Sequence, residues 1–321
     1  MPLQAMIKQR LRKLVRLPRY GPLGLSDPQQ DVEVWLRGAG EPVDVTRNNV
    51  VVALRPFTIG VMFDRHHSVE SGNPLRLCMH EARGAKRLLG SIGLRPAGTI
   101  SLPEHRFCLF EPSGYENYCA PALSLALYYL RARRRAARST RRNPHNFQMS
   151  HADLRSNFVF YICPRPVVLV TVEHEGSSNI FPMDLIGPTD SPWYTMALRS
   201  TSPAVRLMQQ SRRMALASVP FAVRDVAYAL GKHHALSSID WADIPLPTAP
   251  SPLFGLPVPD AALKIREVRV REFHEVGSHV LFVTSIERET NPGNEGPQLF
   301  HSFSPWSDVT PPVRSSSTHQ A

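Results

Sequence analysis

The chain has 321 residues, 42% of them hydrophobic and 20% charged, which is ordinary for a globular protein of one or two domains. Its 30 prolines favour rigid turns over long helices, so we expect a mainly β fold. The net charge of +10 belongs to residues 1–145, which hold 23 Lys and Arg against 11 Asp and Glu. No apolar run approaches the roughly 20 residues that span a bilayer, which argues against integral membrane association.

The first 20 residues are basic and weakly amphipathic, and they lack the apolar core and cleavage site of a secretory signal. An organelle-targeting or membrane-surface helix is one interpretation, and a frayed, solvated helix is the one we favour. The four cysteines form no CxxC pair and have no metal-ligand spacing. We therefore expect free thiols, no bound metal and a cytoplasmic location.

The N-terminal half continues with short β segments between Gly and Pro turns. Residues 49–54, 58–63 and 107–110 are rich enough in β-branched or aromatic side chains to form strands. Residues 120–130 are apolar nearly all round, which indicates a buried helix. We expect an α+β extension or domain of unknown role over residues 1–145.

Residues 131–142 contain seven arginines in twelve positions. One interpretation is a nucleic-acid-binding segment, but no aromatic side chains alternate with the arginines to stack on bases. The interpretation we favour is a helix C-terminus, where the dipole attracts cations, followed by a solvated linker. We expect no nucleic-acid partner, and a domain boundary within residues 138–147.

The C-terminal half alternates strands and short helices. Strands are expected at residues 158–162, 167–172, 179–186, 193–198, 214–219, 263–273 and 279–286. One helix should begin at Ser202 and Pro203, with serine as N-cap, and a second should cover residues 221–230 and end at Gly231. This pattern predicts a small antiparallel barrel over residues 146–290, followed by a loosely ordered tail at residues 291–321.

Four segments in this half resemble the flavin reductase-like family. They are PRPVVLVT at residues 164–171, GSSN at 176–179 leading into FPMDLIG at 181–187, ALRSTSP at 197–203, and GSHVLFV at 277–283. The resemblance covers about 130 residues, roughly 158–289. It implies a Greek-key FMN-binding split barrel that forms a homodimer, with FMN, or FAD in its place, near the subunit interface.

Four residues at the start of the first helix are candidates for binding the flavin phosphate. Free amides and the positive dipole end of a helix suit an anion, Arg199 adds charge, and Ser200 and Thr201 add hydroxyl donors. Ser202 completes this group. The alternative is that Ser202 only caps the helix and Arg199 is a surface charge.

The resemblance also places a segment along the flavin ring and ribityl chain. Its candidates are Asn179, Ile180, Asp184, Leu185 and Ile186. The alternative is an ordinary strand after an ordinary turn. Asp184 departs from the family, which usually has serine or threonine here. Because a carboxylate beside a phosphate is repulsive, we expect Asp184 either to accept hydrogen bonds from ribityl hydroxyls or to point away and leave its backbone amide as the contact.

Three further positions complete the expected site. Arg165 and Pro166 either reach the cofactor or only brace their loop. His279 opens the last hairpin strand, where the family often has a histidine facing flavin and nicotinamide. We take His279 as the catalytic candidate, with a surface turn histidine as the alternative, and expect His233 and His234 to lie in a solvated turn.

The leading hypothesis is an FMN-binding oxidoreductase resembling NAD(P)H:flavin reductases, with NAD(P)H as co-substrate that passes hydride to flavin. The absence of a convincing nucleophile or carboxylate pair fits chemistry that a flavin performs. The alternative is a non-catalytic flavin-binding module, such as a carrier, a sensor or a partner of a monooxygenase.

Overall fold

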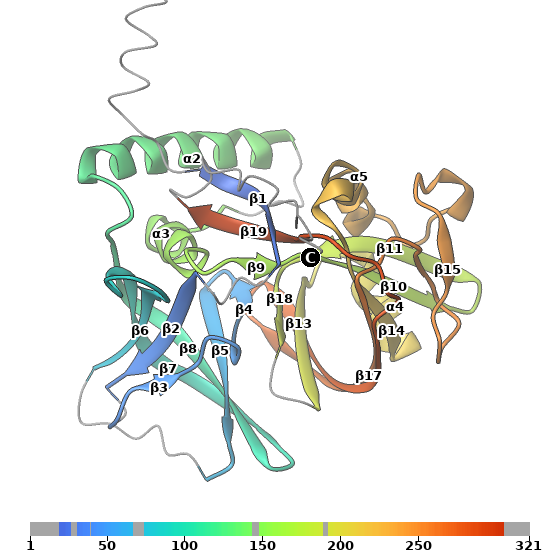
Figure 1. Cartoon of the computed structure of the whole chain (residues 1–321), viewed down its shortest axis with the longest axis horizontal. Helices are drawn as coiled ribbons and strands as arrows, with labels where there is room; N and C mark the ends of the chain where they lie inside the picture. Colours follow the sequence, from blue (N-terminus) through green and yellow to red (C-terminus); the bar gives the residue numbers. More distant parts are fainter. Residues whose placement is uncertain are drawn as a thin grey trace, which may run out of the picture.

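The computed structural model describes residues 19–26, 31–38, 40–66, 74–142, 148–188 and 192–304. Its two large antiparallel sheets lie side by side, and helices lie across one end of the pair (Figure 1). The expected mainly β fold is confirmed. Within the described ranges, no helix is long and apolar enough to cross a membrane.

The N-terminal sheet has seven strands in the order β3-β2-β6-β7-β8-β5-β4. The strands are β2 (Val32–Arg37), β3 (Val43–Asp44), β4 (Asn49–Leu54), β5 (Phe57–Asp64), β6 (Leu75–Glu81), β7 (Leu88–Leu102) and β8 (His105–Asn117). The strands expected at residues 49–54, 58–63 and 107–110 are present. Nearly every residue of β4 and β5 is buried, because both faces of these apolar strands are covered.

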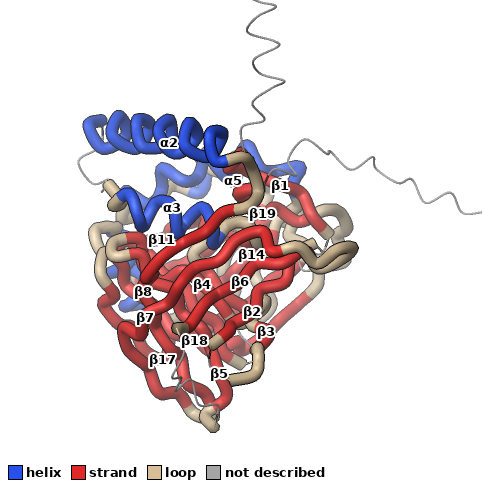
Figure 2. The backbone as a smooth tube through the Cα atoms, turned by 90° about the vertical axis from the view of Figure 1, so that its left-hand side faces the viewer, coloured by secondary structure: helices blue, strands red, loops and turns tan. Residues whose placement is uncertain are grey.

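The helix expected at residues 120–130 is present as α2 (Ala122–Arg142), but it is not buried all round. Leu125 and Tyr129 face the core, whereas Leu123 is 69% exposed and Leu130 47%. The helix lies along the outside of the molecule, above α3 (His151–Phe160) (Figure 2). It continues through the arginine-rich segment to Arg142 instead of giving way to a linker at residue 138.

The strand expected at residues 158–162 is wrong, because α3 runs to Phe160 and a turn follows. A short apolar run suits a buried helix as well as a strand, so periodicity could not separate the two. The local signal is at the other end of the helix, where the Ser150 hydroxyl accepts a hydrogen bond from the amide of Asp153, at 3.0 Å.

The C-terminal sheet also has seven strands, in the order β11-β10-β14-β17-β18-β13-β12. They are β10 (Val168–His174), β11 (Ser177–Met183), β12 (Ile186–Pro188), β13 (Trp193–Arg199), β14 (Arg213–Ser218), β17 (Lys264–Val276) and β18 (His279–Thr290). Six of them correspond to expected strands, whereas β12 is a separate strand that was not expected, because one strand was predicted over residues 179–186. Over the first half of β17, half-buried and buried residues alternate as expected, apart from the bulge between Glu267 and Val268. Helix α4 (Pro203–Ser211) connects β13 to β14.

A mostly helical segment connects β14 to β17. It comprises η2 (Phe221–Val223), α5 (Arg224–Ala229), η3 (Leu230–Ala235), η4 (Trp241–Asp243), β15 (Thr248–Pro250) and β16 (Pro257–Pro259). The helix expected to end at Gly231 continues as η3. The side-chain amide of Asn179 holds this extra turn down by donating to the carbonyls of His233 and Leu236, at 3.1 and 3.0 Å.

A third sheet brings the two ends of the described chain together. Its strands are β1 (Arg19–Leu25), β19 (Gln298–Ser304) and β9 (Arg165–Pro166), with β19 in the centre. The tail expected at residues 291–321 is therefore ordered as far as Ser304, and residues 305–321 lie outside the described ranges. Its Pro, Gly and Asn content concealed the short apolar segment LFHSF, in which Leu299, Phe300 and Phe303 are buried.

The two halves share a hydrophobic core. The largest cluster of buried side chains includes Phe57 and Phe107 from the N-terminal sheet together with Leu185, Leu281 and Phe303 from the C-terminal half. The domain division at residues 145 and 290 stays a prediction, but the two halves pack as closely as layers of one domain.

Candidate functional site

A cavity of about 490 Å³ lies where the C-terminal sheet meets α4, η3 and the N-terminal half. Six of the expected site residues line it: Asp184, Leu185, Arg199, Thr201, Ser202 and His279. Other walls come from outside the barrel, with Tyr20 on β1, Leu54 on β4, and Met149 and Asn157 at α3.

Arg199 and His279 are opposite each other at the end of the β13–β18 pair. The imidazole of His279 is only 1% exposed, and its Nδ1 lies 2.9 Å from the hydroxyl of Ser278. Burial, helped by the positive charge of Arg199, lowers the pKa of His279 to about 4. His279 is therefore neutral at pH 7, and Arg199 supplies the positive charge at this corner of the cavity.

The N-terminal half positions the turn that precedes His279. Gly277 has a positive φ of 52°, and a Cβ there would lie 2.5 Å from the carbonyl oxygen of Arg55. The amide of Ser278 donates to the same carbonyl at 2.8 Å. Only glycine fits this position, because both the backbone conformation and the close approach exclude a side chain.

The turn from Arg199 to Ser202 leads into α4 as the sequence predicts, with Ser202 at the N-cap position and Pro203 following. The Ser202 hydroxyl does not cap the helix, however. It donates instead to the carbonyl of His234 at 2.6 Å, which ties η3 to the start of α4. Thr201 lines the cavity, whereas Ser200 is exposed and its hydroxyl donates to the carbonyl of Ser278 at 3.4 Å.

Asp184 lies in the cavity wall, and two residues that the sequence did not indicate hold its carboxylate. The Tyr161 hydroxyl donates to Oδ2 at 3.0 Å, and Nδ1 of His301 lies 2.8 Å from the same atom. Burial alone would raise the pKa of this carboxyl, but the hydrogen bond and charge of His301, with help from Tyr161, hold it below its usual value. Asp184 is thus a carboxylate paired within the chain.

Aromatic rings surround this pair. The ring of Tyr20 lies 4.1 Å from that of His301 and 5.4 Å from that of Tyr161, measured between centroids. Burial, with the nearby charge of Asp184, raises the pKa of both tyrosines well above the usual value, so both phenols are neutral. Beside them Asn157 is 7% exposed, and within the described residues its Oδ1 has no hydrogen-bond partner.

Arg165 does not reach the cavity and braces the junction of the two halves. Its guanidinium donates to the side-chain and backbone oxygens of Asn49 at 2.6 and 3.2 Å, and lies 4.0 Å from the centre of the Phe160 ring. Of the two interpretations of this residue, the bracing role is the one that the contacts support.

Four other expected residues also lie outside the cavity lining. Pro166 pairs with Phe300 in the third sheet, and Asn179 holds η3 as described above. Ile180 and Ile186 are buried in two separate hydrophobic clusters. For Asn179 and Ile180, the alternative of an ordinary strand after a turn describes the structure better.

His233 and His234, expected in a solvated turn, are instead packed against β11. Nδ1 of His233 lies 2.8 Å from the carbonyl oxygen of Ile180, and Nε2 of His234 lies 2.8 Å from that of Pro182. His234 and its neighbour Lys232 line the cavity. The sequence places the two histidines in a short helical turn, but it does not indicate which side of that turn packs against β11.

Residues 160–305 match the family model described as the flavin reductase like domain. The C-terminal half of the chain therefore carries a flavin reductase-like domain, as its motifs predicted. No curated protein matches the chain.

Three solved structures illustrate the similarity. The FMN-binding protein of Thermus thermophilus is 23% identical over 40% of this chain and 71% of its own, with a TM-score of 0.35. The NADH:FAD oxidoreductase SgcE6 of Streptomyces globisporus is 16% identical over 46% and 88%, at 0.41. The styrene monooxygenase flavin reductase of Pseudomonas putida S12 is 18% identical over 47% and 92%, at 0.39.

Proposed function

We propose that the cavity binds FMN and that the protein is an NAD(P)H-dependent flavin reductase. The observation that carries this proposal is the pairing of Arg199 and Thr201, at the start of a helix, with a largely apolar cavity in a flavin reductase-like domain. A volume of about 490 Å³ falls within the range of roughly 300–1000 Å³ that is usual for small-molecule sites.

The donor set fits a flavin. The guanidinium of Arg199 and the hydroxyl of Thr201 would hold the phosphate, and Lys232 of η3 also lines the cavity. The unpartnered Oδ1 of Asn157 is a buried acceptor in the cavity lining that a donor group of the ligand could satisfy. Bound FMN would supply the two-electron redox chemistry, with NAD(P)H as the hydride donor.

The remaining residues adjust the electrostatics of the cavity. Neutral His279 adds no second charge beside Arg199 and packs the cavity floor. Tyr161 and His301 both contact the Asp184 carboxylate within the chain, so a carboxylate at this position is less available to repel a phosphate than an isolated one would be. This accounts for the departure from the serine or threonine that relatives usually have.

An absorption spectrum of the purified protein, followed by NADH and NADPH titration under nitrogen, tests the proposal. We expect a flavin spectrum that is bleached by one of the two nucleotides. Bound flavin without nucleotide oxidation would instead favour the non-catalytic module, and no flavin binding, with either FMN or FAD, would refute both. The family resemblance implies a homodimer, and the mass measurement below tests it against the monomer inferred in the next subsection.

The phosphate position is tested by Arg199→Ala. A hydrogen bond to a charged group is worth about 1.5–3 kcal/mol, so FMN affinity should fall roughly ten- to a hundredfold. Arg206→Ala is the matched control, because Arg206 is an exposed arginine of α4, the helix that follows Arg199, and lies outside the cavity lining. Equal losses in both variants would mean that only the overall charge matters.

A further inference from the structure

The two large sheets have the same topology. Each is built from two hairpins, a single strand and a third hairpin, all antiparallel. If β2 to β8 are matched in chain order with β10 to β14, β17 and β18, the order β3-β2-β6-β7-β8-β5-β4 becomes β11-β10-β14-β17-β18-β13-β12. Seven strands therefore occur twice in one order.

The irregularities of the third hairpin also repeat. In β7–β8, register shifts follow Gly93 and Pro96, and in β17–β18 they follow Glu267 and Val270. Positions 93 and 267, and 96 and 270, each differ by 174. Bulges are specific features of a fold, so two in the same places indicate one backbone plan used twice.

The same offset of 174 relates His105 to His279, and each opens its strand after a two-residue turn. Across the sheet, His105 is opposite Asp64 at the end of β5, and His279 is opposite Arg199 at the end of β13. The cavity residue Arg199 thus has Asp64 as its counterpart.

The two copies meet through equivalent residues. Counting back along the paired strands from Asp64 and Arg199 makes Val50 of β4 the counterpart of Gly187 of β12. These two residues touch, because a Cβ on Gly187 would lie only 2.7 Å from Cβ of Val50. In a twofold-symmetric dimer, a residue on the axis contacts its own counterpart in the partner subunit. The same arrangement occurs here within one chain.

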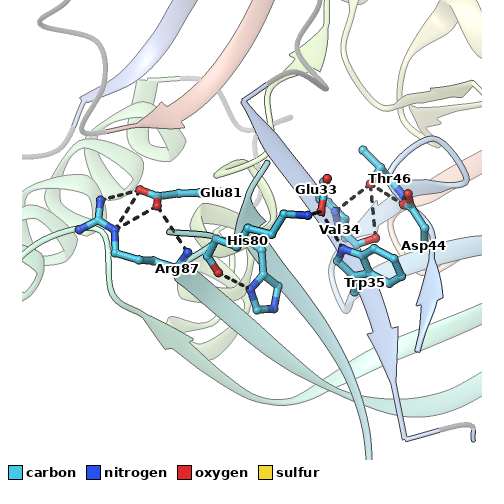
Figure 3. A network of polar contacts seen from close by, with 9 residues as sticks. Glu33, Val34, Trp35, Asp44, Thr46, His80, Glu81 and Arg87 are labelled. Atoms are coloured by element: carbon cyan, nitrogen blue, oxygen red, sulfur yellow. Dashed lines mark hydrogen bonds and ion pairs between the residues drawn. The ribbon is translucent and has the colours of Figure 1, made fainter. Parts of the chain in front are cut away.

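The counterpart of the flavin cavity is small and acidic. It is lined by Asp44, Asp64 and His105 among others, and its volume is about 100 Å³, well below the roughly 300 Å³ of small-ligand sites. The Asp44 carboxylate is engaged by the amide and hydroxyl of Thr46, at 2.9 and 2.6 Å (Figure 3). With Asp64 in place of Arg199, this cavity has neither the space nor the charge for a flavin phosphate.

We propose that residues 32–117 are a degenerate second copy of the flavin domain's sheet that takes the place of a partner subunit, so that one chain is a monomer with a single flavin site. Leu54 of this copy completes that site, together with Met149 and Asn157 from the segment that connects the two large sheets. The number of flavins per chain rests on the proposed flavin binding, whereas the replacement of a partner subunit by residues 32–117 does not.

Mass and stoichiometry provide the first test on the full chain. Sedimentation equilibrium should give the chain mass of 36.0 kDa, and FMN titration should saturate at one flavin per chain. Twice that mass, or two flavins per chain, would overturn the proposal. If the protein bound no flavin at all, the proposed function would fail, and the mass would still decide this inference.

Complementation provides the second test. Leu54→Trp obstructs the wall from the N-terminal half, and Arg199→Ala removes the cation of the C-terminal half. In a dimer whose sites were shared between chains, co-expression of the two variants would rebuild one intact site. We expect no recovery of FMN binding at a concentration near the wild-type Kd, and recovery toward a quarter or more of the wild-type level would overturn the proposal.

Two further variants keep this result interpretable. Met149→Trp obstructs the same wall from a different segment and replaces Leu54→Trp if that variant does not fold. Asp64→Ala, at the exposed counterpart of Arg199, should leave FMN affinity within twofold of wild type. A tenfold loss in Asp64→Ala would mean that the small cavity takes part in binding, which would overturn the single-site proposal.

Discussion

Replacing His279 with glutamine should make the free energy of unfolding depend less on pH in the acidic range. In the folded protein the imidazole is 1% exposed and lies beside Arg199, and its pKa falls to about 4 from the usual 6.5. The unfolded chain has no such restraint. As pH falls below 6.5, His279 takes up a proton in the unfolded state but stays neutral in the folded state, so the free energy of unfolding decreases.

The size of the effect follows from the two pKa values. A difference of one pKa unit corresponds to 1.36 kcal/mol, so the interval from 6.5 to about 4 amounts to about 3 kcal/mol. The destabilisation is absent above pH 7, grows through pH 6 and 5, and is complete near pH 4. It is a substantial share of the roughly 5–15 kcal/mol by which proteins are usually stable.

Urea unfolding of the FMN-free protein at half-unit intervals from pH 8 to pH 4 measures this directly. At pH 8 the glutamine variant reports only the packing cost of the change, because the histidine is neutral in both states. Between pH 6.5 and 4 its free energy of unfolding should fall by about 3 kcal/mol less than that of the wild type. Other buried groups, such as His234, affect both proteins alike.

Thr284→Val is the matched control on the same strand. Its buried hydroxyl donates to the carbonyl of Tyr194 at 2.8 Å and does not titrate, so this variant should lose about 1–2 kcal/mol equally at every pH. If His279→Gln kept the acid dependence of the wild type, the imidazole would be open to protons, and our description of the cavity floor would be refuted.

Two further substitutions test other parts of the structure. Gly187→Val forces a side chain against Val50 at the contact between the sheets, and should lower the free energy of unfolding by about 1–3 kcal/mol or more. Asp184→Asn removes the charge that pairs with His301, and should cost about 1–3 kcal/mol at pH 7. Because the folded pKa of Asp184 is lowered, that cost should shrink as pH falls below about 4, where the unfolded carboxyl is already protonated.

Both substitutions are measured by urea unfolding. Gly114→Val is the control for Gly187, because a Cβ on Gly114 meets nothing within 4 Å, and it should change stability by less than about 0.5 kcal/mol. Equal losses in the two glycine variants would contradict the close contact. A loss in Asp184→Asn that stayed constant down to pH 3 would contradict the ion pair with His301.

The sequence predicted the C-terminal sheet well because its signals are local. The alternation in β17 and the Ser202-Pro203 start of α4 each lie within a few residues. At residues 158–162 the same reasoning failed, because a run of apolar side chains without period suits α3 as well as a strand. The repeated plan of the N-terminal sheet was missed because it lies in strand order and bulge positions, which similar sequence need not accompany.

The candidate site could be predicted only in part, for a related reason. Arg199, Thr201 and His279 lie in short motifs and were found. Tyr20 and His301, at opposite ends of the described chain, meet only because the third sheet forms. Pairings between distant segments leave no local pattern in a single sequence.

The pairing of β1 with β19 has a consequence for the order of folding. Within the described strands β1 pairs with β19 alone, and 273 positions separate Leu25 from its partner Gln298. Closing so long a loop in an otherwise unfolded chain would cost about 5 kcal/mol of entropy, by the scaling (3/2)RT ln n. The strand pair should therefore form after both large sheets have shortened the loop.

During synthesis, β1 is the first of the described strands to emerge and β19 is the last, so β1 has no partner until the other strands have been made. Until then Tyr20 cannot take its place against His301, and that side of the cavity stays open. We therefore expect a period during synthesis in which both large sheets have formed while the cavity is still accessible from the β1 side. Cofactor loading during that interval would meet less of a barrier than exchange in the finished protein.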